Sequence, residues 1–543
     1  MQEVSTDWKQ AHKRTLLNES FVEVSLDIAD PDALSKASAE DNGAIYISNA
    51  SGVTDGVDNT PTPYCTLEQN LWCLDGNRKA IPESSFGDNG FVSDVLSDDT
   101  CIFRAKAPVV TVKFVNELGE PIVFNKLIPG ITITWSDTYG EFADTFSIIA
   151  YNGDTVVAER EIVGNRSVKT LVFLEIVGYD RIVILVKKWC LPNHRARVED
   201  VLVGLHKVYT KNELFDYAHK QIVDPVSTSL PKAEISFSID NVEGEYNPYN
   251  TDGLAKYLME RQEVKARYGL KMDDGTIQWL NGGTFYLSEW FAKQNGITAE
   301  FTARDLLEFM SATYHDTVTE IKPRTLFALA EAVLTSAELP VNSDGSAKWY
   351  IDPSLDDEER FSTSAPLPED TLANCLQLIA NAGECVLYQD RSGTLRIEPL
   401  KFIETDYKID AFNSYSKSEI TLSKPIKQIK IKVYSYSIGE KGIESTTTEV
   451  TKEIGTTGET ITIDNPLITN TDRANSLATW LAKHLGHRMT LDSSWRGDVR
   501  LDALDIVTNE NEYQASRVRM TEVEFRYNGA FRATGKGKVI EDG

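Results

Sequence analysis

The sequence predicts an α+β protein that is mostly β. Two barrel-like domains flank a small α/β domain, and a β-sandwich (jelly roll) is inserted in the first barrel. Most of the 543 residues fall into short stretches in which apolar and polar residues alternate, the pattern of half-buried strands. Beyond a short helix-like start, helical spacing of apolar residues is confined to stretches between 324 and 485. The alternating stretch at 21–28 is followed by a long loop-like segment, so no other predicted strand lies near it in the sequence.

The first barrel is expected to be discontinuous, covering 1–28 and 208–313. Residues 21–28 alternate between apolar and polar, and the pattern then stops in a segment rich in Asp, Ser, Asn, Gly and Pro. Clean alternation returns at 233–240 and 264–268. Because the early strand would otherwise have no partner, we infer that it pairs with these later strands and that the residues between them are an insertion.

The inserted domain is expected to span 29–207. Strand-like stretches at 109–114, 131–135, 146–151 and 181–186 are separated by turn signals, with no helical stretch between them. Short strands in this arrangement are typical of a β-sandwich or jelly roll.

A small α/β domain is expected at 314–420. Apolar residues recur at helical spacing in 324–337 and in 369–382, and Gly383 stands where a helix C-cap belongs. Two short strands are predicted to follow within 385–397.

The second barrel is expected at 421–543. One helix is predicted within it, with apolar residues sharing a face over 474–485 and Gly486 ending it. The dipeptide Asn528-Gly529 predicts a hairpin between the last two strands.

Composition limits the class of protein. The chain has 82 acidic and 55 basic residues, a formal charge of −27, which disfavours nucleic acid and anionic membranes as partners. No stretch approaches the roughly 20 apolar residues that cross a bilayer, and the first residues do not resemble a signal peptide. Six sparse cysteines without a C-x-x-C pair are expected to be reduced thiols, so synthesis in a cytoplasm is predicted.

Catalytic motifs are absent from the sequence. It has no H-E-x-x-H, G-x-S-x-G, P-loop or dinucleotide-binding phrase, so we predict no catalytic residues, no cofactor and no enzyme. His484 and His487 are close together at a helix end. One interpretation is that the two histidines bind a metal ion. We favour the other, that they are protonated side chains stabilised by the helix C-terminus, and predict no metal. A structural calcium and a chance carboxylate pair at glycosidase spacing stay open alternatives.

One weak binding feature stands out. Trp135 and Tyr139 flank the turn Ser136-Asp137-Thr138, where an exposed aromatic pair would stack on a sugar ring. The alternative is that Trp135 belongs to the core at the end of its strand.

The inserted region resembles known tail proteins. Residues 64–76 read Tyr-Cys-Thr-Leu-Glu-Gln-Asn-Leu-Trp-Cys-Leu-Asp-Gly. This resembles a phrase in tail proteins of phages of Gram-positive hosts, where it precedes a galactose-binding-like (discoidin-type) sandwich. Cys65 stands where alanine is usual. The segments 130–135, 179–184 and 192–198 resemble strands that such domains carry.

The flanking regions resemble phage tail hub proteins. Several phrases between 236 and 305 are similar to the first barrel of these hubs, and 465–468 with 495–498 are similar to later hub segments. The sequence departs from these hub proteins at two positions: Val499 stands where they usually have proline, and Leu504 stands where they usually have glycine.

The resemblance implies a structural hub of the tail tip or baseplate of a phage or phage-like particle. It implies a homotrimer that caps the tail tube and contacts the tube, distal tail proteins and other baseplate or receptor-binding proteins. The insert would bind host-surface glycan or neighbouring baseplate proteins, without nucleic acid or membrane insertion. The location implied is the virion, after synthesis in the host cytoplasm. The alternative is a secreted carbohydrate-active or glycan-binding protein, which would need clustered carboxylates and a secretion signal.

Overall fold

The computed structural model describes most of the chain. The described residues are 1–14, 18–34, 36–40, 43–45, 48–54, 66, 68, 71, 90–116, 118–293, 296–316, 320–340, 347–402, 404–439, 442–510 and 514–540.

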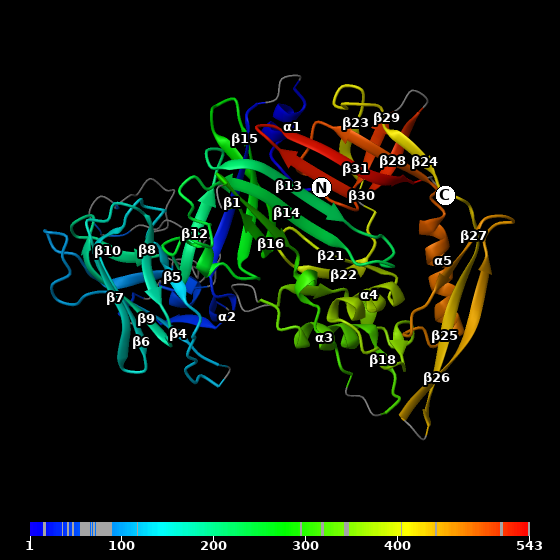
Figure 1. The fold of residues 1–543 in the computed structure, drawn as a ribbon, viewed down its shortest axis with the longest axis horizontal. Helices are drawn as coiled ribbons and strands as arrows, with labels where there is room; N and C mark the ends of the chain where they lie inside the picture. Colours follow the sequence, from blue (N-terminus) through cyan, green and yellow to red (C-terminus); the bar gives the residue numbers. More distant parts are fainter. Residues whose placement is uncertain are drawn as a thin grey trace.

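A 13-stranded sheet runs through the centre of the molecule (Figure 1). Eleven strands follow in the order β12-β1-β15-β16-β17-β14-β13-β30-β31-β28-β24, and β29 joins β23 to β30. The bounds are β1 (Ser20–Ala29), β12 (Gly204–Tyr209), β13 (Leu214–Ile222), β14 (Lys232–Asp240), β15 (Glu263–Lys271), β16 (Ile277–Ala292), β17 (Thr298–Arg304), β23 (Glu404–Ile409), β24 (Glu419–Leu422), β28 (Met489–Trp495), β29 (Ile506–Glu510), β30 (Ala515–Tyr527) and β31 (Phe531–Val539).

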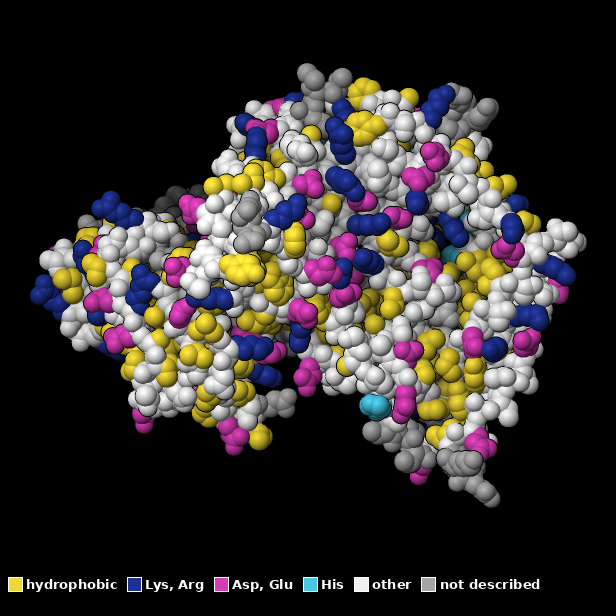
Figure 2. Space-filling view, in the orientation of Figure 1, with side chains coloured by type: hydrophobic (Ala, Val, Ile, Leu, Met, Phe, Trp, Pro, Cys, Tyr) yellow, Lys and Arg dark blue, Asp and Glu magenta, His cyan; other side chains and the backbone are white. Residues whose placement is uncertain are grey.

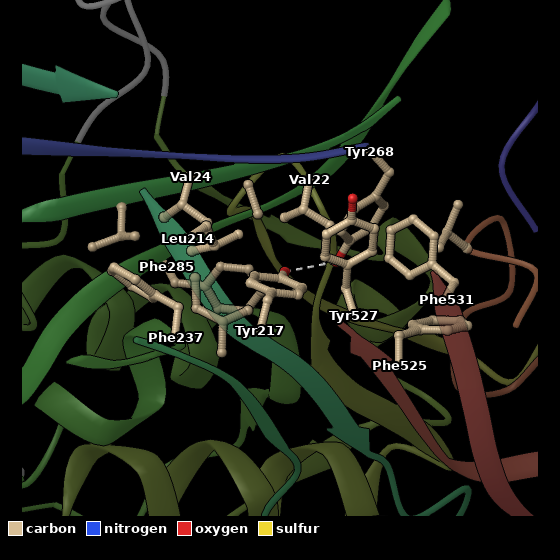
Figure 3. Packing of buried hydrophobic residues seen from close by; sticks show 14 of the residues in the cluster. Val22, Val24, Leu214, Tyr217, Phe237, Tyr268, Phe285, Phe525, Tyr527 and Phe531 are labelled. Atoms are coloured by element: carbon tan, nitrogen blue, oxygen red, sulfur yellow. Dashed lines mark hydrogen bonds between the residues drawn. The ribbon is translucent and has the colours of Figure 1, made fainter. Parts of the chain in front are cut away.

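Two strand groups meet in this sheet. The first strand group is β1 with β12–β17, and the second is β23, β24 and β28–β31. They are joined by antiparallel pairing of β13 with β30, from Tyr217 opposite Tyr527 to Ile222 opposite Glu522; we call this pairing the seam. One hydrophobic core lines the inner face on both sides of the seam, so aromatic rings of the two groups pack together (Figure 3).

The early strand pairs as the inferred insertion requires. Strand β1 pairs antiparallel with β15 on one side and with β12 on the other. The approach of β12 to β1 depends on Gly204, because a Cβ there would lie 2.6 Å from the carbonyl oxygen of Ile28.

A β-sandwich lies between β1 and β12 in the sequence and to one side of the sheet in space (Figure 1). Its antiparallel sheets have the orders β2-β4-β9-β6-β7, β11-β5-β8 and β10-β3 around a separate core. The bounds are β2 (Ala37–Glu40), β3 (Phe91–Leu96), β4 (Val109–Phe114), β5 (Ile128–Thr134), β6 (Ala143–Asn152), β7 (Thr155–Val163), β8 (Lys169–Ile176), β9 (Arg181–Trp189), β10 (Arg195–Val198) and β11 (Asp200–Leu202).

The third core is built from helices and short strands beneath the sheet. Its elements are β18 (Arg324–Thr325), α3 (Leu326–Ser336), β19 (Trp349–Ile351), β20 (Ser362–Thr363), α4 (Leu372–Ala382), β21 (Cys385–Gln389), β22 (Leu395–Pro399), β25 (Ile426–Gly439), β26 (Gly442–Glu453), β27 (Glu459–Ile463) and α5 (Thr471–Leu485). Side chains of β25, β27 and α5 share this core with α3 and α4. The predicted domain boundaries stay predictions.

The remaining elements are short helices. They are α1 (Thr6–His12), α2 (Pro31–Leu34) and the 3-10 helices η1 (Ala50–Thr54), η2 (Ala255–Tyr257), η3 (Leu306–Phe309) and η4 (Pro353–Asp356). Within the described part of the chain, no helix combines the length and apolar character needed to cross a membrane.

The predicted fold class is confirmed: the chain is α+β and mostly β, with a sandwich inserted among the strands of the first group. The helices expected at 324–337, 369–382 and 474–485 are α3, α4 and α5. Gly383 caps α4, but its φ is −80° and the left-handed conformation falls on Glu384 at φ +55°.

Candidate assembly surfaces

The sandwich buries Trp135 completely. Its ring packs edge-on against Phe146 and Trp189, with ring centroids 4.8 and 6.0 Å away, and its indole N–H donates to Thr170 Oγ1 at 3.0 Å. The ring therefore presents no face to a sugar in this structure. The Tyr139 ring is half-buried, and the Arg197 guanidinium lies 4.9 Å from its centroid.

Buried charged side chains occupy the same end of the sandwich. Glu141 accepts a hydrogen bond from the Trp189 indole at 2.8 Å and lies 2.8 Å from His194 Nδ1. Arg197 donates to Glu68 at 2.6 Å and lies 3.6 Å from Glu141. These contacts join Glu68, from the segment 64–76, to the segment 192–198, and both segments share the resemblance to phage tail domains. Of the first segment, only Thr66, Glu68 and Leu71 lie within the described residues.

His484 lies in the last turn of α5, where its ring packs edge-on against Trp480 at 5.2 Å. Burial, together with the nearby Arg519, lowers the pKa of His484 to about 4. The side chain is therefore neutral near pH 7, so the favoured interpretation of a cation at a helix C-terminus is wrong for His484. No group of three or more His, Cys, Asp or Glu side chains suited to a metal ion occurs in the part of the chain that the structure describes.

Arg391 ties three distant segments together below the seam. From the turn between β21 and β22, its guanidinium donates to Asp502 at 2.7 Å and to the carbonyl oxygen of Asn281 at 2.9 Å. It also donates to the carbonyl oxygens of Val499 at 2.7 Å and Leu501 at 3.0 Å. Burial raises the pKa of Asp502, but the Arg391 charge, the hydrogen bond from Gln2 and the charge of the N-terminus together more than offset this, so the net shift is downward. The carboxylate is therefore ionised and paired.

A polar chain crosses the core beside the seam (Figure 3). The hydroxyls of Tyr217 and Tyr268 lie 2.8 Å apart, and His219 Nδ1 lies 2.7 Å from the Tyr268 hydroxyl. Burial, reinforced by the positive charge of Arg391, lowers the pKa of His219 to about 3. A neutral imidazole can accept the Tyr268 proton, which leaves Tyr268 free to accept the Tyr217 proton.

The outer face of the sheet carries a row of alternating charges across the seam. Ion pairs link Glu289 to Arg304 and Arg304 to Glu234, both at 3.0 Å. Lys220 pairs with Glu522 at 2.9 Å across the seam itself. We call this set the charge row; its members, from β16 to β28, are Glu289, Arg304, Glu234, Lys220, Glu522, Lys536 and Asp492. Figure 2 shows Lys and Arg interspersed with Asp and Glu over this region.

Exposed apolar side chains gather at the free end of the sheet. Strand β24 pairs only with β28 among the described strands, and its Ile420 and Leu422 are 57% and 62% exposed. Two further exposed aromatic side chains, Phe412 and Tyr415, lie in the segment between β23 and β24. We call these four residues the β24 rim. Exposed apolar edges of this kind are templates for pairing with another chain.

The opposite end of the sheet is covered by the sandwich. Thr132 of β5 donates to the carbonyl oxygen of Gly204 at 3.1 Å, and the amide of His206 donates to Thr132 Oγ1 at 2.9 Å. The β12 end is thus occupied within the chain, in contrast to the β24 rim.

A second exposed apolar patch lies at a tip of the first strand group. The amide of Asn241 donates to the carbonyl oxygen of Ile297 at 2.7 Å, which brings loop 241–253 against the β16–β17 hairpin. The exposed apolar residues of this region are Val242, Tyr249, Phe291 and Ile297, and its exposed acids are Asp240, Glu243, Asp252 and Glu300. We call this set the acidic tip.

No protein-family model matches the sequence, and no curated protein does. Among solved structures, the chain is similar to a tail protein from Neisseria meningitidis MC58, with 12% identity and a TM-score of 0.43 over 62% of this chain and 94% of that one. It is also similar to the 43 kDa tail protein of prophage MuSo2 from Shewanella oneidensis, with 12% identity and a TM-score of 0.40 over 61% and 94%. The prophage tail protein gp18 from Listeria monocytogenes EGD-e is similar at 11% identity and a TM-score of 0.38, over 61% and 91%.

Proposed function

We propose that the chain is a structural hub of the tail tip or baseplate of a phage, or of a phage-like particle, of a Gram-positive host. In this role it forms a homotrimer that caps the tail tube and organises the proteins of the tip, and it acts as a virion component rather than as an enzyme. The observation that carries the proposal is the seam. It places the two regions that resemble hub barrels in one sheet with one core, so each subunit presents both as a single rigid unit.

The distribution of exposed side chains supports assembly through the β24 rim and the acidic tip. The charges of the charge row pair with one another, so the row itself offers little to a partner. The β24 rim and the acidic tip instead expose apolar groups on opposite strand groups. Two different patches on one chain favour head-to-tail contacts, which close into a ring when the rotation between subunits allows it.

The insert is proposed to contact either host glycan or a neighbouring baseplate protein. Among the described residues of the sandwich, Phe173 is the one aromatic side chain with high exposure, and the other exposed apolar side chains are aliphatic. Sugar binding usually relies on exposed aromatic rings, so this surface favours a protein neighbour. Binding of the full-length chain to a glycan array would reverse that preference.

The ring proposal is tested by imaging the purified chain by negative-stain electron microscopy. The wild-type chain is expected to give threefold particles, and the double variant Ile420→Lys/Leu422→Lys to give single subunits. The matched control is Val156→Lys/Val157→Lys, which places the same charges on exposed β7 of the insert. Rings in the Ile420→Lys/Leu422→Lys variant would exclude the β24 rim as a subunit contact.

A further inference from the structure

One position on the outer face of the sheet departs from charge alternation. Arg519 of β30 lies directly opposite Lys538 of β31, so two cations face each other across the strands. The next residues in the same row are Ile506 on β29 and Thr490 on β28, neither of which carries a charge. Like charges placed directly opposite destabilise an antiparallel pair. A short distance along the same strands, Lys536 lies between Glu522 and Asp492.

Arg519 is buried and has no acidic partner among the residues that the structure describes. The residue is 6% exposed, and its Nε atom is buried with no hydrogen-bond partner. Its side chain has no ion pair with any residue that the structure describes; its guanidinium carbon lies 5.9 Å from the Phe402 ring centroid. Desolvation lowers the pKa of Arg519, as expected for a buried cation without a compensating carboxylate.

Arg517 is a neighbouring arginine that has an acidic partner. It lies two residues earlier on the same strand, and its guanidinium lies 4.7 Å from the same Phe402 ring. It also forms an ion pair with Glu404 at 3.3 Å. The two arginines share a strand and an aromatic neighbour, and they differ in whether an anion is present.

The C-terminal end of α5 lies near Arg519. Burial is the main cause of the lowered pKa of His484, and the charge of the nearby Arg519 adds to it. The partial negative charge of a helix C-terminus is only about half an elementary charge, which does not balance a buried arginine.

We propose that Arg519 and Lys538 form a binding site for an oxyanion, either a carboxylate or a phosphate. The anion supplies the negative charge that is missing between the two opposed cations, and the planar arginine donates hydrogen bonds to its oxygens. The site is independent of the hub role: it requires only the β30–β31 pairing. In an assembled particle, an acidic side chain of a neighbouring protein provides the same chemistry as a free anion.

Titration calorimetry of the full-length chain tests the proposal, with inorganic phosphate and glutarate as separate probes in chloride buffer of matched ionic strength. Saturable binding of phosphate is expected, and Arg519→Gln or Lys538→Gln should weaken it by roughly tenfold or more. The controls Arg517→Gln and Lys536→Gln remove cations that already have acidic partners and should leave the affinity within about twofold of the wild type. Binding of glutarate as well as phosphate would show that carboxylates are accepted. Binding of phosphate alone would restrict the ligand to phosphate.

Thermal unfolding gives a second readout that does not depend on affinity. In chloride alone, Arg519→Gln should melt at the same temperature as the wild type or higher, because it removes an unpaired buried charge. Phosphate should raise the melting temperature of the wild type but not of Arg519→Gln. Failure of both probes to bind the wild type, or a variant that loses stability without losing binding, would overturn the proposal.

Discussion

The inserted sandwich and the central sheet both bury charged side chains, but they pair them differently. In the sandwich, Glu141 contacts His194 and Arg197, which belong to the same domain and share its core. In the central sheet, Arg391 reaches from the small α/β region to Asp502 in the second strand group and to Asn281 in the first. The sandwich is therefore a self-contained unit, whereas the sheet and the region beneath it depend on one another.

Removal of Arg391 is expected to have the largest effect. Arg391→Ala leaves Asp502 without its cation and leaves three backbone carbonyl groups without this donor, so the free energy of unfolding should fall by about 3–5 kcal/mol. The measurement is urea unfolding followed by tryptophan fluorescence. The control Arg526→Ala removes an exposed cation paired with Glu524 and should cost less than about 1 kcal/mol. Equal effects for the two variants would show that Arg391 does not link the segments.

A substitution in the sandwich should act locally. Glu141→Gln weakens the charged contacts to His194 and Arg197 and should destabilise the insert by about 2–3 kcal/mol. Hydrogen exchange followed by mass spectrometry should show faster exchange in β5, β6 and β9 and unchanged exchange in β13 and β30. Faster exchange in both regions would contradict the independence of the insert.

Acid should destabilise the seam through His219. The folded state holds its pKa at about 3, below the ordinary value near 6.5, so the unfolded chain takes up the proton first as the pH falls. The stability loss therefore begins below about pH 6.5, reaches about 2 kcal/mol at pH 5, and grows until the pH approaches 3. His219→Gln removes this titration, so its unfolding free energy should fall less steeply than that of the wild type between pH 6.5 and 5. Parallel slopes for the two proteins would show that His219 is not shielded from protons.

The smallest effect is expected on the charge row. Lys220→Gln removes the ion pair with Glu522 across the seam, a contact in which both side chains are partly exposed. Such pairs contribute less than about 1 kcal/mol and are screened by salt. Unfolding measured at low and high ionic strength should show a difference between variant and wild type that shrinks as salt is added. A large, salt-independent loss would indicate that the row holds the two strand groups together.

Local patterns predicted much of the fold. Alternation located β1, β4 and β14, helical spacing located α3, α4 and α5, and Asn528-Gly529 marked the β30–β31 turn. The need of β1 for a partner also predicted its pairing with β15, because a half-buried strand cannot stand alone. The strands, helices and turn could be predicted because they depend on residues close together in the sequence. The pairing of β1 depends only on its need for a neighbouring strand.

The seam and its buried polar groups could not be predicted in the same way. Arg391 looks like an ordinary residue of a hairpin turn, and its partners at 281 and 499–502 are about 110 residues away in either direction. Arg519 appears on an alternating strand like Arg517, and only the register with β31 reveals that Lys538 faces it. For Trp135 the local pattern left two alternatives, an exposed ring beside the turn or a core residue at the strand end, and the structure buries the ring in the sandwich core.

The central claim, that one subunit with two separate exposed apolar patches assembles into a ring, is tested most directly by the mass of the purified chain in solution. Light scattering on a sizing column, run over a range of protein concentrations and salt, is the measurement. The account predicts a species near three times the 60.6 kDa subunit, favoured by salt because the acidic subunits repel each other when unscreened. A monomer under every condition would contradict ring formation by this chain alone.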